Sequence, residues 1–257
     1  AIYNAAVHDA QLRCAQLLAA SGDAATAAAL CQQVWTSSRP VAWRLGGLIT
    51  LAKIAKDKAA PIVIEALTSD DPLLQATALR LTRELPGQEV TAALVQRLGK
   101  LDANGQVLLL GVLAERGDRS AAEAVAKLTD SKEAAVRAAA LLAMASLGDA
   151  SCIQRLATVA STEQGAVQQA ARSALGRLPG ADVDAKLLAA TAEGDPAIRA
   201  EMIRALAARR AAGAAPLLLK AATDASHAVR GAAFDALGSL GAPADYPAAI
   251  QLLVAAA

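Results

Sequence analysis

Aromatic residues are almost absent from this 257-residue chain, which contains one Phe, two Tyr and two Trp. Two His and three Cys are too few for a multi-histidine metal centre or a disulfide framework. Neither sign of charge dominates, since 25 basic residues face 24 acidic ones, so the chain has no overall basic field for nucleic acid. Scattered charges also interrupt the apolar runs before they reach the roughly 18 residues that a membrane span needs.

The residues that remain favour helix throughout the chain. Apolar residues make up 55% of it, which excludes an intrinsically disordered protein. Ala, Leu, Glu, Lys, Arg and Gln are abundant and have high helix propensities, whereas β-branched residues are scarce. The chain begins Ala-Ile-Tyr-Asn without a visible signal peptide, so the sequence does not indicate a cellular compartment.

A repeat of 31 residues organises the chain. The residues just before each repeated position, and those four and seven positions after it, are mostly apolar, as Leu48, Leu110 and Leu141 illustrate. This spacing predicts an amphipathic helix, and it also places Leu17 in the buried stripe of the first repeat. The repeated positions, which we call the anchors, hold only Arg or Gln: Arg13, Arg44, Gln75, Gln106, Arg137, Gln168, Arg199 and Arg230.

A second helix follows the first in each repeat. Polar residues four positions before the anchors, such as Asp9, Asp71 and Asp102, are typical N-caps of the first helix. A helical hairpin of this size cannot bury both its apolar stripes alone, so neighbouring hairpins must stack. We therefore predict an all-α fold, a right-handed superhelical α-solenoid of about eight 31-residue hairpins that forms one array over residues 1–257. The second apolar stripe contains Val63, Leu94, Val125, Leu156, Leu187 and Leu218.

Two segments near the end of the chain resemble a known family. Asp195-Pro196-Ala197-Ile198-Arg199 with Ala205-Leu206, and Ala228-Val229-Arg230 with Ala236-Leu237-Gly238, are similar to HEAT repeats of the short bacterial type found in phycobilisome lyases. The resemblance covers roughly residues 8–254, with a period shorter than the ~40–47 residues of long HEAT and armadillo units. Two residues depart from the pattern: Arg172 stands in an apolar column, and Gly105 stands where Val or Ile is expected.

The anchors invite interpretation as a row of anion-binding groups, but a structural role explains them better. Each lies in the first turn of a helix beside an inter-repeat loop, where its side chain can bond loop carbonyls and capping carboxylates. Trp35 and Trp43 are expected to pack together between the first two repeats. The cysteines, Cys14, Cys31 and Cys152, are expected to be small buried hydrophobes with free thiols.

No catalytic residue, metal site or cofactor is predicted. His8 and His227 lie at opposite ends of the chain, and no Gly-rich phosphate loop of the Walker type occurs. A HEAT-like metal hydroxylase would carry paired His-Glu motifs, which this sequence does not have.

The resemblance implies that the second helices line the concave side of the array and that their outward-facing residues bind partners. These residues stand 18, 21 or 22 positions after an anchor, and we call them the outward column. We expect a non-enzymatic scaffold that binds a partner protein or a neighbouring domain of its own chain. An ordinary solvated face would carry the same residue types. This predicted surface comprises Glu65, Gln96 and Arg97 in the N-terminal half of the groove and Lys127, Arg155, Lys186 and Lys220 in the C-terminal half.

The C-terminal half of this surface leans basic, which suits an acidic or extended partner segment. The same charge leaves open nucleic-acid binding through the basic half of the groove. An enzyme is the other alternative, a lyase-like or chaperone-lyase HEAT protein that acts on a bound cofactor. Residues 248–254 carry no charge. We therefore expect the chain to be a segment of a larger protein, or its last helix to pack on a partner or a second copy.

Overall fold

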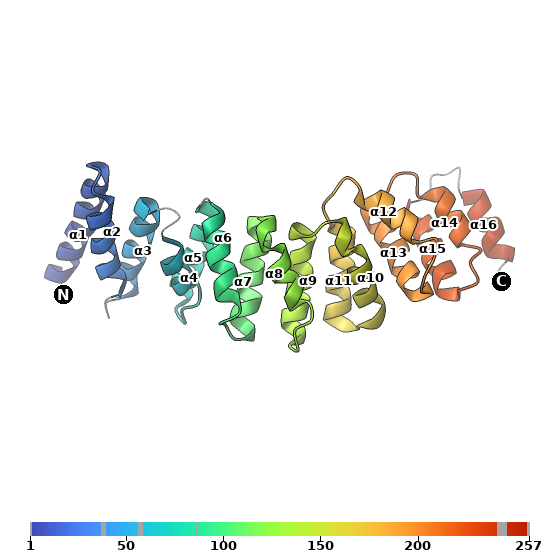
Figure 1. The fold of residues 1–257 in the computed structure, drawn as a ribbon, viewed down its shortest axis with the longest axis horizontal. Helices are drawn as coiled ribbons and strands as arrows, with labels where there is room; N and C mark the ends of the chain where they lie inside the picture. The colour runs from blue at the N-terminus through green and yellow to red at the C-terminus, as the bar shows by residue number, and fades with distance from the viewer. Residues whose placement is uncertain (1, 37–39, 56–58, 86, 241–245, 256–257) are drawn as a thin grey trace. The chain divides into compact units, whose positions relative to one another are not determined.

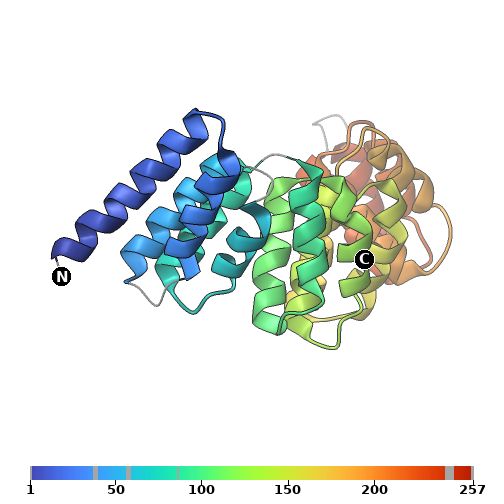
Figure 2. The same cartoon turned by 60° about the vertical axis from the view of Figure 1, so that its left-hand side comes forward.

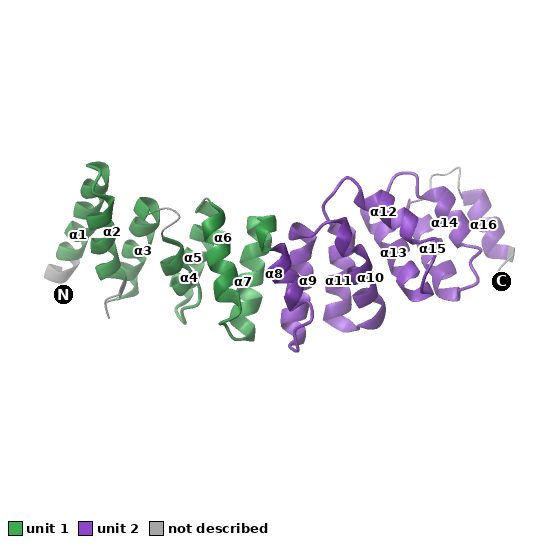
Figure 3. Ribbon diagram, in the orientation of Figure 1, with its two compact units in different colours: residues 1–121 green, residues 122–257 purple. Residues whose placement is uncertain are grey.

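The computed structural model describes residues 2–36, 40–55, 59–85, 87–240 and 246–255. All regular secondary structure in these residues is helical, and the chain is an all-α solenoid of helical hairpins, as predicted. It divides into two compact units, residues 1–121 and residues 122–257 (Figure 3). None of the described helices is both long enough and apolar enough to cross a membrane.

Unit 1 is a stack of helical hairpins in which the first helix of each hairpin packs on the first helix of the next (Figures 1 and 2). Its first helices are α1 (Ile2–Ala20), α3 (Val41–Ala55), α5 (Pro72–Glu84) and α7 (Ala103–Arg116). Its second helices are α2 (Ala24–Thr36), α4 (Ala60–Leu67) and α6 (Gln88–Leu98), and it ends with the short 3-10 turn η2 (Arg119–Ala121).

Unit 2 repeats the same arrangement. Its second helices are α8 (Ala122–Leu128), α10 (Ile153–Thr162), α12 (Val183–Ala190), α14 (Ala215–Ala221) and α16 (Tyr246–Ala255), with the 3-10 turn η3 (Ala150–Cys152) leading into α10. Its first helices are α9 (Ala134–Leu147), α11 (Gly165–Arg177), α13 (Pro196–Arg209) and α15 (His227–Leu240).

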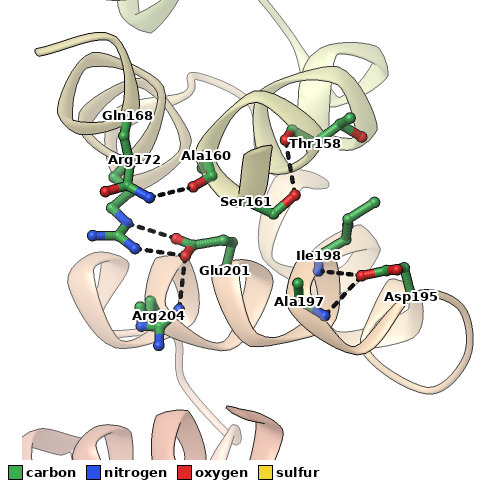
Figure 4. Close-up of polar contacts among 10 residues, drawn as sticks. All are labelled: Thr158, Ala160, Ser161, Gln168, Arg172, Asp195, Ala197, Ile198, Glu201 and Arg204. Carbon is green, nitrogen blue, oxygen red and sulfur yellow. Dashed lines mark hydrogen bonds and ion pairs between the residues drawn. The ribbon is translucent and has the colours of Figure 1, made fainter. Parts of the chain in front are cut away.

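Aspartate caps begin several of the first helices. Asp71 accepts from the backbone N–H groups of Leu73 and Leu74, and Asp195 caps α13 in the same way (Figure 4). Asp102 caps α7 through the N–H of Gly105. The predicted cap at Asp9 is wrong: α1 already begins at Ile2, so Asp9 lies inside the helix and pairs with Arg13, 2.6 Å away.

The core of each hairpin follows the predicted columns. All six residues of the second-helix stripe, from Val63 to Leu218, are at most 1% exposed. The first repeat departs from the register, because Leu17 is 70% exposed and Ala15 is buried in its place. Ala15 packs against Ala27 and Cys31 of α2 and Leu51 of α3, so the side of α1 that carries Leu17 is turned away from these helices.

The cysteines differ in their exposure. Cys31 is fully buried, and this burial raises the pKa of its thiol to about 11. Cys152 is partly buried. The prediction of a buried Cys14 is wrong: it lies on the solvent side of α1, three residues before Leu17, for the same reason that Leu17 is exposed.

The predicted structural role of the anchors is confirmed from Gln75 onward. Each of these anchor side chains donates to a main-chain carbonyl in the last turn of the preceding second helix or just beyond its end. The acceptors are Ser69 O for Gln75, Leu98 O for Gln106, Ser131 O and Lys132 O for Arg137, Ala160 O for Gln168, Thr191 O for Arg199, and Asp224 O and Ala225 O for Arg230, at 2.6–3.3 Å.

Two arginines that the repeat analysis missed make similar bonds at the other end of the hairpin. Arg116 donates to the carbonyls of Thr82, Leu85 and Gly87, which follow α5 or lie in its last turn. Arg209 donates to the carbonyl of Leu178, at 2.8 Å. Both stand ten positions after an anchor, in a column that is otherwise mostly apolar, so no repeated pattern marks them.

Replacing one anchor tests this role. Arg137→Ala is expected to lower the free energy of unfolding by roughly 1–3 kcal/mol, because it leaves carbonyls unpaired at a junction. Lys127→Ala should change it by no more than about 0.5 kcal/mol, since this side chain is 73% exposed and its ion pair is with the exposed Glu123. Urea unfolding of the two variants measures the difference. Equal losses of stability in the two variants would contradict the assignment of Arg137 to a junction and of Lys127 to the exposed surface.

Thiol labelling tests the assignment of the cysteines. At about pH 8 the thiolate is the reactive form, so the exposed Cys14 should react quickly with a disulfide reagent. Cys31 should stay unreacted until the protein unfolds, because it is buried and its pKa is raised to about 11. Cys14→Ser should remove the fast phase alone. Fast labelling of Cys31 in the native protein would contradict the packing of unit 1.

Candidate functional site

The residues of the predicted partner-binding surface are all exposed on second helices, as the outward column requires. Val34 occupies the equivalent position of the first repeat, outside the predicted surface, and is buried at 1% exposure. In unit 1 the surface consists of Glu65 on α4 and Gln96 and Arg97 on α6. In unit 2 it consists of Lys127 on α8, Arg155 on α10, Lys186 on α12 and Lys220 on α14.

Three of the four predicted surface residues in unit 2 form ion pairs with neighbouring carboxylates. Lys127 Nζ lies 2.9 Å from a carboxylate oxygen of Glu123, and Arg155 pairs with Asp130. Lys186 Nζ lies 2.8 Å from a carboxylate oxygen of Asp182, and this hydrogen bond raises the pKa of Lys186. The basic lean expected of this half is therefore largely cancelled by neighbouring carboxylates.

Lys220 differs from these three residues. Within the described part of the chain no carboxylate lies within ion-pair distance of its ammonium group. It borders a hollow of about 290 Å³ that also contains the ion pair of Arg199 and Asp224, at 2.6 Å. Hydrogen bonds from the Ser226 backbone and from Arg199 lower the pKa of Asp224, so this carboxylate is engaged and not open to a ligand.

In unit 1 the three predicted residues come together around one hollow. Glu65, Gln96 and Arg97 line a space of about 530 Å³ between α4 and α6. Lys100, just beyond the end of α6, lines it as well, three residues after Arg97. The column analysis missed Lys100 because it follows the helix. Pro61, Ile64 and Ala93 form the apolar part of the wall. We call this space the α4–α6 hollow.

A second hollow of about 450 Å³ adjoins the first within unit 1. It shares Arg97 and Lys100 with the α4–α6 hollow, so these two cations border both spaces. Polar groups from the loop after α4 and from the start of α7 form much of the rest. They include Thr68, Ser69, Asp70, Asp102 and Asn104, and we call this space the polar hollow.

The two shared cations have no counter-ion in the part of the chain that the structure describes. Among the described residues, no carboxylate oxygen lies within 4.0 Å of Arg97 or Lys100, and no group accepts a hydrogen bond from either side chain. Asp102 borders the polar hollow but already caps α7. Arg97 and Lys100 therefore keep their donors available, unlike Lys127, Arg155 and Lys186.

The α4–α6 hollow is connected through Glu65 to a buried tryptophan. Trp35 is 1% exposed, and its indole N–H points to a Glu65 oxygen at 3.5 Å. The guanidinium of Arg44 lies over the same ring, 4.7 Å from its centroid, which is a cation–π contact. The predicted packing of Trp35 on Trp43 is wrong: Trp43 instead packs on His8, with ring centroids 4.5 Å apart, because α1 covers that side of α3.

Unit 2 contains a cluster that explains the Arg172 departure (Figure 4). Arg172 on α11 donates from Nε and Nη2 to both oxygens of Glu201 on α13, each at 2.7 Å. Arg204, one turn later on α13, donates to the same carboxylate at 2.7 Å. Glu201 is only 4% exposed. Two guanidinium groups, each 40% exposed, compensate its charge.

The described residues contain no group of three or more His, Cys, Asp or Glu side chains placed to hold a metal ion. His8 contacts Gln11 and Trp43, and its Nδ1 lies 2.9 Å from the Gln11 side-chain oxygen.

The comparison with family models agrees with the fold. A family model described as HEAT repeats matches residues 91–176 and 184–257, more than half of the chain. Human deoxyhypusine hydroxylase in complex with glycerol is similar over 89% of this chain and 90% of its own, at 18% identity and a TM-score of 0.42. An engineered protein is similar over 94% of this chain and 74% of its own, at 19% identity and a TM-score of 0.40. No curated protein matches the sequence.

The cluster around Glu201 gives a prediction about stability. Arg172→Leu should lower the free energy of unfolding by roughly 1–3 kcal/mol, because a buried carboxylate loses two charged hydrogen bonds. Adding Glu201→Leu should recover most or all of this loss, since apolar residues of similar volume often replace a buried ion pair without cost. Urea midpoints of the single and double variants measure both effects. A double variant less stable than Arg172→Leu would contradict the prediction.

Proposed function

Because the chain belongs to the HEAT-repeat family, we propose that it is a non-enzymatic interaction module. Its exposed second-helix surface binds a partner protein or a neighbouring domain of a longer chain. The contact residues are Glu65, Gln96 and Arg97 in unit 1 and Lys127, Arg155, Lys186 and Lys220 in unit 2, with Lys100 as an addition from the structure.

The α4–α6 hollow is the observation that supports this proposal most strongly. Arg97 and Lys100 border two adjoining spaces of about 530 and 450 Å³ and have no counter-ion among the described residues. Charged groups that serve only to keep a protein soluble do not need a hollow beside them. Here unpaired donors stand next to apolar walls, which is the combination that recognition sites use.

The paired cations of unit 2 are compatible with the same function. The pair of Lys127 and Glu123 is highly exposed, at 73% and 86%, and the pair of Lys186 and Asp182 is more than half exposed. Exposed ion pairs of this kind contribute only about 0–1 kcal/mol. A partner carboxylate can therefore replace the internal one at little cost, and these residues extend the surface without dominating it.

Capture of partners by the immobilised 257-residue chain tests the proposal. Arg97→Glu with Lys100→Glu should abolish the capture of specific partners, because it reverses the charges at the centre of the unit 1 surface. The matched control is Lys53→Glu with Arg177→Glu, which makes the same change in charge at exposed cations on the first helices α3 and α11.

The expected result is a set of proteins that the wild-type chain and the control capture and the Arg97/Lys100 variant does not. Circular dichroism and thermal melting should be the same for all three proteins. Equal capture by all three would remove the second-helix surface of unit 1 as the binding site. Loss with the control alone would move the site to the first helices.

A further inference from the structure

We infer that the two hollows of unit 1 bind one extended segment of a partner protein, with a single acidic side chain two residues away from an apolar one. This inference rests on the proposed function and gives the chemistry of the partner at the same surface. In this arrangement the acidic side chain lies between Arg97 and Lys100, and the apolar side chain lies in the α4–α6 hollow.

The case for an acidic side chain comes from the unused donors. Arg97 offers up to five N–H donors and Lys100 three, and the described residues accept from none of them. Cations near the C-terminal end of α6 also suit the helix dipole, but that interaction leaves the donors themselves unbonded. A carboxylate bonds a guanidinium through two parallel hydrogen bonds, so it is the group that fits this position.

The case for a single carboxylate comes from the acidic residues nearby. Glu65 borders the α4–α6 hollow, and Asp70 and Asp102 border the polar hollow. These carboxylates border the same two hollows as the cations and repel further negative charge. A polyanion such as nucleic acid or a polyglutamate tract would place charge against them, whereas one isolated acidic residue does not.

The case for an extended backbone comes from two side-chain amides. Gln96 borders the α4–α6 hollow and Asn104 borders the polar hollow, and both are exposed without a hydrogen bond to the described residues. Each amide can donate to and accept from a peptide group. A helix satisfies its own peptide groups and would leave these amides unused, whereas an extended segment presents its peptide groups to them.

The spacing of the two side chains follows from the extended geometry. Alternate residues of an extended chain project from the same side, about 6.6 Å apart. The apolar wall of Pro61, Ile64 and Ala93 and the two cations border the same α4–α6 hollow. An aliphatic residue against that wall therefore brings the acidic residue two positions along to the cations.

Selection from a displayed library of random peptides on the full 257-residue chain tests the inference. Selected sequences should be enriched in one Asp or Glu placed two residues from Leu, Ile, Val or Met. Arg97→Gln with Lys100→Gln should weaken the binding of these peptides by roughly tenfold or more, because it removes the charged hydrogen bonds. Lys53→Gln with Arg177→Gln, the matched control, should bind them as the wild type does.

Trp35 provides an independent signal. The chain has two Trp residues, so Trp43→Phe leaves Trp35 as the only one. Because its indole N–H points to Glu65, which borders the hollow, a bound peptide should change the emission of Trp35. The change should saturate with the selected peptide and disappear when its acidic residue is replaced by the corresponding amide. A saturating change that the amide peptide reproduces would overturn the assigned carboxylate.

The outcomes separate the inference from the proposed function. Selected peptides that depend on Arg97 and Lys100 but lack an acidic residue would overturn the inference and leave the surface as a binding site. Selection of polyanionic sequences would overturn the single carboxylate. Failure to select any peptide would overturn the extended segment, while the capture experiment would still decide whether the surface binds folded partners.

Discussion

The hydrogen bond from each anchor to a carbonyl near the end of the preceding second helix is the contact on which the described array depends from Gln75 onward. A helix leaves its last carbonyls without partners, and in a stack of short hairpins these ends lie close to the next hairpin. The anchor fills that need from the first turn of the next first helix, as Gln75 does with Ser69 and Arg199 with Thr191. The bond joins each second helix to the first helix of the next hairpin.

The sequence predicts this architecture where the 31-residue repeat is regular. The second-helix stripe and the outward column recur at the same position in many repeats, so burial at Val63 or Leu218 and exposure at Gln96 follow from the period alone. The first repeat could not be predicted in the same way. Its helix α1 turns Ala15 toward α2 and α3, so Leu17 and Cys14 are exposed although they satisfy the apolar pattern.

Which cations of the candidate site are available to a partner depends on ion pairs between residues at different positions of the repeat. The period predicts that Lys127, Arg155 and Lys186 face outward, but it cannot show that Glu123, Asp130 and Asp182 neutralise them. Lys100 lies beyond its helix, where the period no longer constrains it. Arg172 departs from its apolar column because it pairs with Glu201 on a neighbouring helix. Contacts between columns decide which charges remain open, and they are visible only in three dimensions.

From Gln75 onward, Arg and Gln anchors differ in the number of polar contacts that they make at the junctions between hairpins. Gln168 reaches one carbonyl, whereas Arg137 and Arg199 also contact Glu163 and Asp224 beyond the following second helix. Asp224 is thus held by its side chain to Arg199 and by its carbonyl to Arg230. In a repeat array the cooperativity of unfolding is set by such interfaces between neighbours. These additional contacts make each such Arg junction a link through which the unfolding of one hairpin is coupled to that of the next.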